Sequence, residues 1–180
     1  MSTQQADGEI LDARTVRFER LLPGPIERVW AYLTESEKRR KWLAAGPMEL
    51  HAGGRVELRF NNSELTPHAE TPPEKYKKND GSTVVLWTVT RCDPPRSLVI
   101  KWGEQPEDSE VTFELESRGD KVLLTVTHRR LGSREFMVSV GAGWQTHLAI
   151  LSAHLNDQAP PPFWSTHAAL EAEYDSRIPA

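Results

Sequence analysis

Apolar and polar residues alternate with a period of two over most of the middle of the chain. Such a period is typical of strands with one buried face. It occurs at residues 15–22, 55–60, 82–91, 97–102, 111–116 and 122–128. A further short strand at residues 48–50 is expected to pair with residues 55–60 across a turn at Gly53 and Gly54. The pattern predicts a meander of about six or seven antiparallel strands with one wet and one dry face.

Two short helices are predicted after the first strand. Pro25 stands where a helix tolerates proline, at its first position, and apolar residues recur at helical spacing over residues 26–33. Thr34 and Glu37 have the spacing of a capping box. A second short helix is therefore expected to start there and to carry Trp42 inward.

A much longer helix is predicted near the C-terminus. Apolar residues recur every three or four positions from Phe136 to Leu155, which gives a helix with a single apolar face. Ser133 is expected to be its N-cap. After a polyproline-type connector at residues 159–162, residues 163–178 are expected to form a short last helix that packs back on the domain.

Together these elements predict an α+β fold. A curved antiparallel sheet wrapped around the long helix would bury the apolar face of that helix, and a gap is expected between the two. The expected organisation is a flexible leader at residues 1–12, one domain at residues 13–157, and a Pro-rich connector with a short helix at residues 158–180. The polar segment 61–80 is expected to be a flexible or functional loop.

Composition and charge argue against a wholly disordered, collagen-like or disulfide-stapled chain. With 38% apolar and 27% charged residues the chain can bury a core, and its net charge of -4 argues against sequence-independent nucleic-acid binding. Cys92 is the only cysteine, which excludes an internal disulfide and fits the cytoplasm. No apolar run is long enough to cross a bilayer. Neither a metal site nor a cofactor is expected, because no motif for one is present.

Six segments in order resemble a known family. They are residues 20–30 (RLLPGPIERVW), residues 41–43 (KWL), residues 53–56 (GGRV), residues 93–98 (DPPRSL) with Trp102, residues 124–128 (LTVTH), and Gly143-Trp144. Together they resemble the START-like, or SRPBCC, superfamily of helix-grip proteins. Within it, the chain is similar to the branch related to the activator of the ninety-kilodalton heat-shock protein's ATPase.

The resemblance implies a deep apolar cavity between the sheet and the long helix, and binding of hydrophobic small molecules there. It implies no catalytic set, because members include lipid and hormone carriers, aromatic cyclases and chaperone activators. A link to lipid binding and to the stress response follows from the resemblance alone.

Aromatic residues on the predicted dry faces are candidates for the lining of this cavity. A ligand site is expected to be mostly apolar with few polar groups. The candidates are Trp42, Phe60, Trp87, Trp102, Phe113, His128, Trp144, His147, Leu148 and Leu151. The alternative for the tryptophans is an ordinary aromatic core.

Two histidines are the candidate polar groups of the cavity. His128 shares the parity of the buried residues in its strand, and His147 lies on or beside the apolar face of the long helix. Either could orient a ligand hydroxyl or act as a base. The alternative for both is a structural histidine whose hydrogen bonds are satisfied. Gly141 and Gly143 are expected to mark a close approach of the helix to a strand.

Three functions are compatible with these observations. The first is a module that binds a lipid-like or flat aromatic molecule in the cavity. The second is a co-chaperone-like or regulatory module whose partner is a chaperone or regulator, bound through residues 35–41, residues 75–78 and the tail from Pro160. The third is a polyketide cyclase or aromatase-like enzyme, which only the cavity and one or two histidines support. A non-enzymatic role is favoured because no catalytic set is visible.

Overall fold

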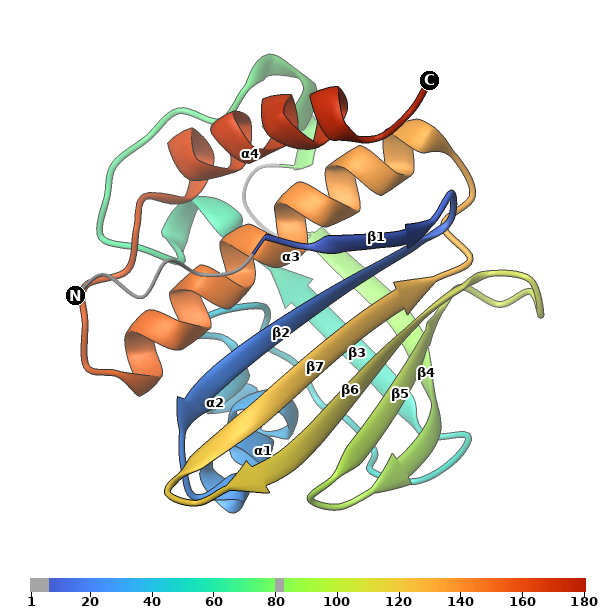
Figure 1. Ribbon diagram of the computed structural model, residues 1–180, viewed down its shortest axis with the longest axis vertical. Helices are drawn as coiled ribbons and strands as arrows, with labels where there is room; N and C mark the ends of the chain where they lie inside the picture. Colours follow the sequence, from blue (N-terminus) through green and yellow to red (C-terminus); the bar gives the residue numbers. More distant parts are fainter. Residues whose placement is uncertain (1–6, 80–82) are drawn as a thin grey trace.

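A single curved sheet forms one wall of the molecule. The structure is a computed structural model that describes residues 7–79 and 83–180. Within these residues, seven antiparallel strands are arranged in the order β1-β2-β7-β6-β5-β4-β3. They are β1 (Glu9–Asp12), β2 (Thr15–Pro23), β3 (Arg55–Phe60), β4 (Thr83–Asp93), β5 (Ser97–Trp102), β6 (Ser109–Arg118) and β7 (Lys121–Arg129). Figure 1 shows the sheet below the two C-terminal helices.

The alternation in the sequence accounts for the strands. In β2, Val16 and Phe18 are buried against the helices while Glu19 is exposed on the outer face. The pairing of β4 with β5 shifts register between Val89 and Arg91, which places a β-bulge there. A bulge bends its strand and increases the local twist, so it contributes to the curvature that the helices need.

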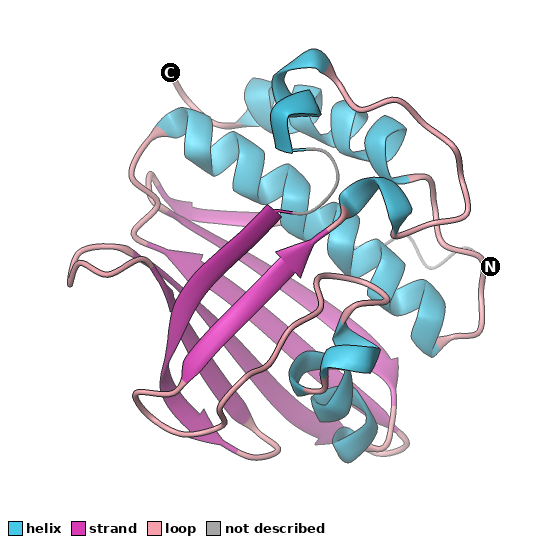
Figure 2. Ribbon diagram, turned by 180° about the vertical axis from the view of Figure 1, so that it is seen from behind, coloured by secondary structure: helices cyan, strands magenta, loops and turns pink. Residues whose placement is uncertain are grey.

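Four α-helices complete the described part of the fold. The long helix α3 (Arg134–Leu155) crosses the concave face of the sheet, and α4 (Phe163–Arg177) packs on the side of α3 away from the sheet (Figures 1 and 2). The short helices α1 (Ile26–Thr34) and α2 (Ser36–Arg39) lie at one end of the sheet. Ser133 caps α3 as predicted, because its Oγ accepts a hydrogen bond from the Phe136 N–H at 3.1 Å. In the described part of the chain, no helix has the length and hydropathy of a membrane-spanning segment.

The expected leader of residues 1–12 is partly wrong. Residues 9–12 form β1, which pairs with β2 through Glu9 and Arg17. This strand is held mainly by backbone pairing and is largely exposed, so it has no apolar alternation for the sequence to show. Residues 1–6 of the expected leader lie outside the described residues.

The second short helix and the first hairpin also differ from expectation. Thr34 does not cap α2, because its Oγ1 donates to the Trp30 carbonyl oxygen at 2.9 Å. Helix α2 ends at Arg39, whose buried side chain donates to carbonyl oxygens at the end of α1 and after α2, and Trp42 follows in a turn. Residues 48–50 form no strand, and Met48 makes only an isolated bridge to β3.

The polar segment between β3 and β4, which was expected to be a loop, contains regular structure. It contains two short 3-10 helices, η1 (Asn62–Glu64) and η2 (Glu74–Asn79), and residues 80–82 lie outside the described residues. Trp164 at the start of α4 donates through its Nε1 to the Ser63 Oγ at 2.9 Å. The segment therefore packs against α4. Together they cover the space between α3 and the concave face of the sheet from the outside.

Candidate functional site

A cavity of about 230 Å³ lies between the concave face of the sheet and helix α3. Its lining residues are apolar, aromatic or neutral polar, and no Lys, Arg, Asp or Glu is among those that the structure describes. The strands contribute Leu58, Phe60, Trp87, Ile100, Trp102, Val111 and Phe113; α3 contributes Phe136, Ser139, Val140, Gly143, Trp144 and His147; α4 contributes Phe163, Trp164 and His167; and Leu43, Asn62 and Tyr76 complete the lining.

Six of the ten predicted lining residues do line this cavity. They are Phe60, Trp87, Trp102, Phe113, Trp144 and His147. The other four, Trp42, His128, Leu148 and Leu151, are buried in the core and are outside the lining. A single apolar face of a helix can meet both a core and a cavity, and the periodicity of α3 does not distinguish the two.

Stacked tryptophans dominate the sheet side of the cavity. The rings of Trp87 and Trp102 lie parallel, with their centroids 4.1 Å apart and their planes at 14°. Phe60 meets Trp87 edge to face at 6.2 Å, and Phe113 meets Trp144 in the same way at 5.6 Å. Ring pairs in these geometries add to the stabilisation from burial. The cavity therefore has a flat, rigid aromatic wall.

His128 is a structural residue. Its Nδ1 accepts a hydrogen bond from the Trp144 Nε1–H at 3.0 Å, so its Nε2 carries the proton and donates to the Ser109 Oγ at 3.0 Å. Burial lowers the pKa of His128 to about 3. Both ring nitrogens are used inside the core, and the satisfied structural histidine is the interpretation that the geometry supports.

His147 uses only one of its two ring nitrogens. Its Nδ1 lies 2.8 Å from the Trp42 carbonyl oxygen. Burial lowers the pKa of His147 to about 4, against a smaller raising effect of this hydrogen bond. The contact also gives Trp42 a role that differs from the expected one, because its backbone, not its ring, orients a cavity residue.

The two glycines of α3 have different surroundings from those expected. Gly141 faces α4 and not a strand, since a Cβ at this position would lie 3.0 Å from a ring carbon of Tyr174. Gly143 lines the cavity, and a Cβ there would meet no atom within 4 Å. Gly141 therefore permits close helix packing, and Gly143 leaves space in the cavity.

The sequence did not single out the outer wall of the cavity. Trp164 stacks on Tyr76 with centroids 5.4 Å apart, which joins α4 to η2. Glu70 accepts hydrogen bonds from the Trp164 and Ser165 N–H groups, and so it caps the start of α4. The adjacent aromatics Phe163 and Trp164 were the only signal in the sequence for this wall.

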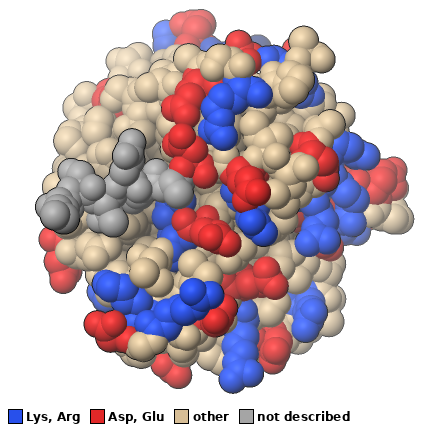
Figure 3. All heavy atoms as spheres, in the orientation of Figure 1, with Lys and Arg blue, Asp and Glu red and all other residues tan. Residues whose placement is uncertain are grey.

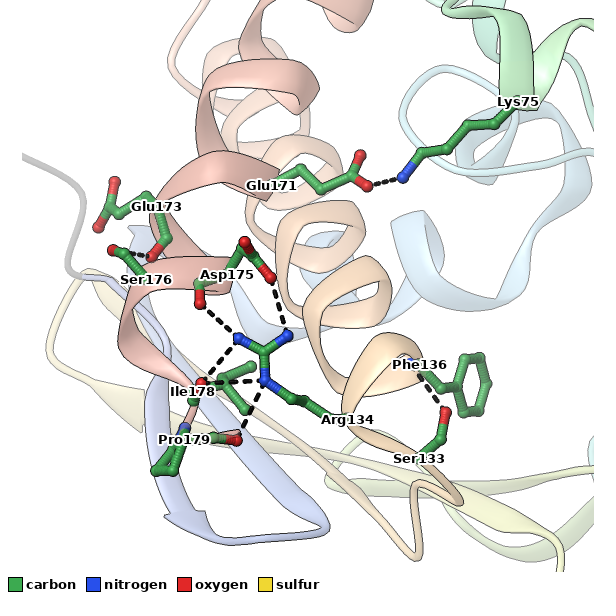
Figure 4. A network of polar contacts seen from close by, with 10 residues as sticks. All are labelled: Lys75, Ser133, Arg134, Phe136, Glu171, Glu173, Asp175, Ser176, Ile178 and Pro179. Atoms are coloured by element: carbon green, nitrogen blue, oxygen red, sulfur yellow. Dashed lines mark hydrogen bonds and ion pairs between the residues drawn. The ribbon is translucent and has the colours of Figure 1, made fainter.

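Polar contacts hold α4 in place at its other end. Arg134, at the start of α3, donates to the Asp175 carboxylate and to the carbonyl oxygens of Asp175, Ile178 and Pro179 (Figure 4). Nearer the cavity, Lys75 of η2 pairs with Glu171 of α4. Polar contacts therefore hold α4 both at its C-terminal end and close to the cavity.

Comparisons with known proteins agree with this geometry. The family described as Activator of Hsp90 ATPase homolog 1-like protein matches residues 23–156, which confirms the resemblance seen in the sequence. A protein from Bordetella parapertussis is 45% identical, with a TM-score of 0.81 over 100% of this chain and 97% of that chain. No curated protein matches the chain.

Two more distant structures share the fold alone. CalU16 from Micromonospora echinospora is 22% identical, with a TM-score of 0.69 over 100% of both chains. The Aha1 dimer from Colwellia psychrerythraea is 19% identical, with a TM-score of 0.58 over 78% of this chain and 95% of that chain. The predicted helix-grip fold is confirmed.

Proposed function

Because the chain belongs to the family of Activator of Hsp90 ATPase homolog 1-like proteins, we propose that it binds a hydrophobic small molecule between the sheet and α3. The observation that carries the proposal is the uncharged cavity with its stacked Trp87 and Trp102. Ligand sites are typically concave, mostly apolar and supplied with a few polar groups. A flat aromatic molecule fits this wall better than a branched one.

A cavity-filling substitution tests the proposal directly. Gly143 faces open space, so Gly143→Leu places a side chain in the cavity, whereas the matched control Gly143→Ala adds one methyl group. We expect the neutral fluorescent probe N-phenylnaphthylamine to bind the wild type and the control. Its affinity for Gly143→Leu should be at least about tenfold lower. Melting temperatures of all three proteins check the fold. Equal binding by the leucine variant, or no binding by the wild type, would refute the proposal.

The protein-interaction alternative has less support from the surfaces first considered for it. Lys75 pairs with Glu171, and the tail from Pro160 leads into α4, which packs on α3. These groups make contacts within the protein and are less available to a partner.

Acidic and basic side chains are interspersed on the face shown in Figure 3. This face has no broad basic patch of the kind that binds nucleic acid. The cytoplasmic location stays a prediction.

The cyclase-like alternative depends on a free base in the cavity. His128 does not provide one, because both of its ring nitrogens are engaged in the core. His147 lines the cavity, but no Lys, Arg, Asp or Glu among the described lining residues joins it in a catalytic group. We therefore favour binding over catalysis.

A further inference from the structure

The tautomer of His147 is fixed by its surroundings. A carbonyl oxygen can only accept, so the 2.8 Å contact with the Trp42 oxygen places the proton of the neutral ring on Nδ1. The Nε2 atom then carries a lone pair. It makes no hydrogen bond within the part of the chain that the structure describes, although the side chain lines the cavity and is only 7% exposed.

The ring of His147 is also held in position. Phe60 and Phe163 contact it from the sheet and from α4, with centroids 6.4 and 5.2 Å away. Trp42, whose carbonyl accepts from Nδ1, is itself anchored by its Nε1–H to the Tyr32 carbonyl oxygen at 2.7 Å. The free acceptor is therefore pre-organised before any ligand arrives, and pre-organisation lowers the cost of binding.

Several other polar atoms of the lining are already paired. The Nε1–H groups of Trp144 and Trp164 donate to His128 and Ser63, and the Tyr76 hydroxyl donates to Glu171 at 3.2 Å. Three further atoms, Trp102 Nε1, Asn62 Oδ1 and His167 Nδ1, are buried and make no hydrogen bond among the described residues. His167 is the competing imidazole, and its Nδ1 lies 3.5 Å from the Glu171 carboxylate. No cation lines the described cavity to receive an anionic ligand. Burial of an unpaired carboxylate there would be strongly unfavourable.

We infer that His147 Nε2 is the polar anchor of the cavity and accepts a hydrogen bond from a hydroxyl group on a neutral aromatic ligand. The inference rests on the proposed binding function and specifies its ligand class. An ether with the same aromatic body would leave Nε2 unpaired in a largely apolar site. A carboxylate would bring a charge with no partner. The cavity thus selects hydroxylated aromatic molecules over their ethers and over aromatic or fatty acids.

Three probes with one bicyclic body test this selectivity. They are β-naphthol, β-naphthyl methyl ether and β-naphthoate, each measured by displacement of N-phenylnaphthylamine near neutral pH. We expect the wild type to bind β-naphthol about tenfold more tightly than the ether, which is the value of one well-made hydrogen bond in a buried site. The binding of β-naphthoate should be weaker than that of the ether. Equal affinities for β-naphthol and its ether would overturn the inference.

Variants assign the selectivity to one nitrogen. In His147→Phe the preference for β-naphthol over the ether should fall to below about twofold, whereas the matched control His154→Phe, on the same helix but outside the cavity lining, should keep it. Each preference is a ratio within one protein, so a uniform loss of affinity does not affect it. Preference retained in His147→Phe, or lost equally in His154→Phe, would refute the assignment.

A measurement on the unchanged protein covers the case in which His147→Phe does not fold. The ¹⁵N chemical shift of His147 Nε2 should report an unprotonated nitrogen in the free protein and should move on addition of β-naphthol but not of the ether. A shift that is the same with both compounds would contradict the inference. If N-phenylnaphthylamine binds while the naphthol preference is absent, only the anchor is wrong; if nothing binds, the proposed function fails as well.

Discussion

Three buried histidines should make the stability of this protein depend steeply on pH. Burial is the largest cause that lowers the pKa of His128 to about 3, of His147 to about 4 and of His167 to about 4. In the unfolded chain each should titrate near its ordinary value of about 6.5. Between these two values the unfolded chain binds protons that the folded protein does not. The stabilising contribution is therefore complete above about pH 6.5 and is lost as the pH falls toward 4.

The size of the effect follows from the number of protons. Each proton bound only by the unfolded state lowers the free energy of unfolding by about 1.4 kcal/mol per pH unit. Three such histidines give about 4 kcal/mol per pH unit near pH 5. Since a domain of this kind is stable by about 5–15 kcal/mol, acid unfolding should be well advanced between about pH 4 and pH 5.

Urea unfolding followed by tryptophan fluorescence, repeated from about pH 7.5 down to about pH 4.5, measures this dependence. In His167→Phe the slope near pH 5 should fall by about one third, because one of the three protons is removed. A free energy of unfolding that stays constant from about pH 7 to about pH 5 would show that these side chains are not neutral and buried together.

Three further substitutions test how the elements are held together. Arg134→Ala should cost about 1–2 kcal/mol and increase hydrogen exchange at the end of α4, while the exposed control Arg118→Ala should change little, as urea unfolding would show. Gly46→Ala should cost about 1–3 kcal/mol, because a methyl group would overlap a backbone carbonyl oxygen at a φ of +124°, and should cost more than Gly53→Ala, where the space is open. Ser133→Ala should lower the melting temperature through loss of about 1 kcal/mol of capping.

The parts of the fold that follow from periodicity could be predicted from the sequence. In β6 the buried Val111, Phe113 and Leu115 alternate with polar residues, and the long helix α3 keeps one apolar face through to Leu155. Strand β1 could not be predicted, because residues 9–12 gain their partner through backbone hydrogen bonds and bury little. The early end of α2 could not be predicted either. It coincides with the buried Arg39, which donates to the carbonyl oxygens of Thr34 before α2 and Ala44 after it.

The candidate site was predictable only on the sheet side and along α3. Alternation places Trp87 and Trp102 on the concave face, but it does not show which inward residues meet a cavity and which meet other side chains. The same holds for α3, where Leu148 was expected in the cavity lining but is fully buried in the core. The wall made by Tyr76 and Trp164 depends on contacts between segments about ninety residues apart, which no local pattern contains.

The cavity is bounded by residues inside and outside the segment that matches the family. The segment that the family shares ends at residue 156, whereas Phe163, Trp164 and His167 lie beyond it on α4. These residues contact the interior without taking part in the strand pairing that holds the sheet together. Substitution at these positions therefore changes the shape of the interior and leaves the hydrogen-bonded pairing of the strands intact.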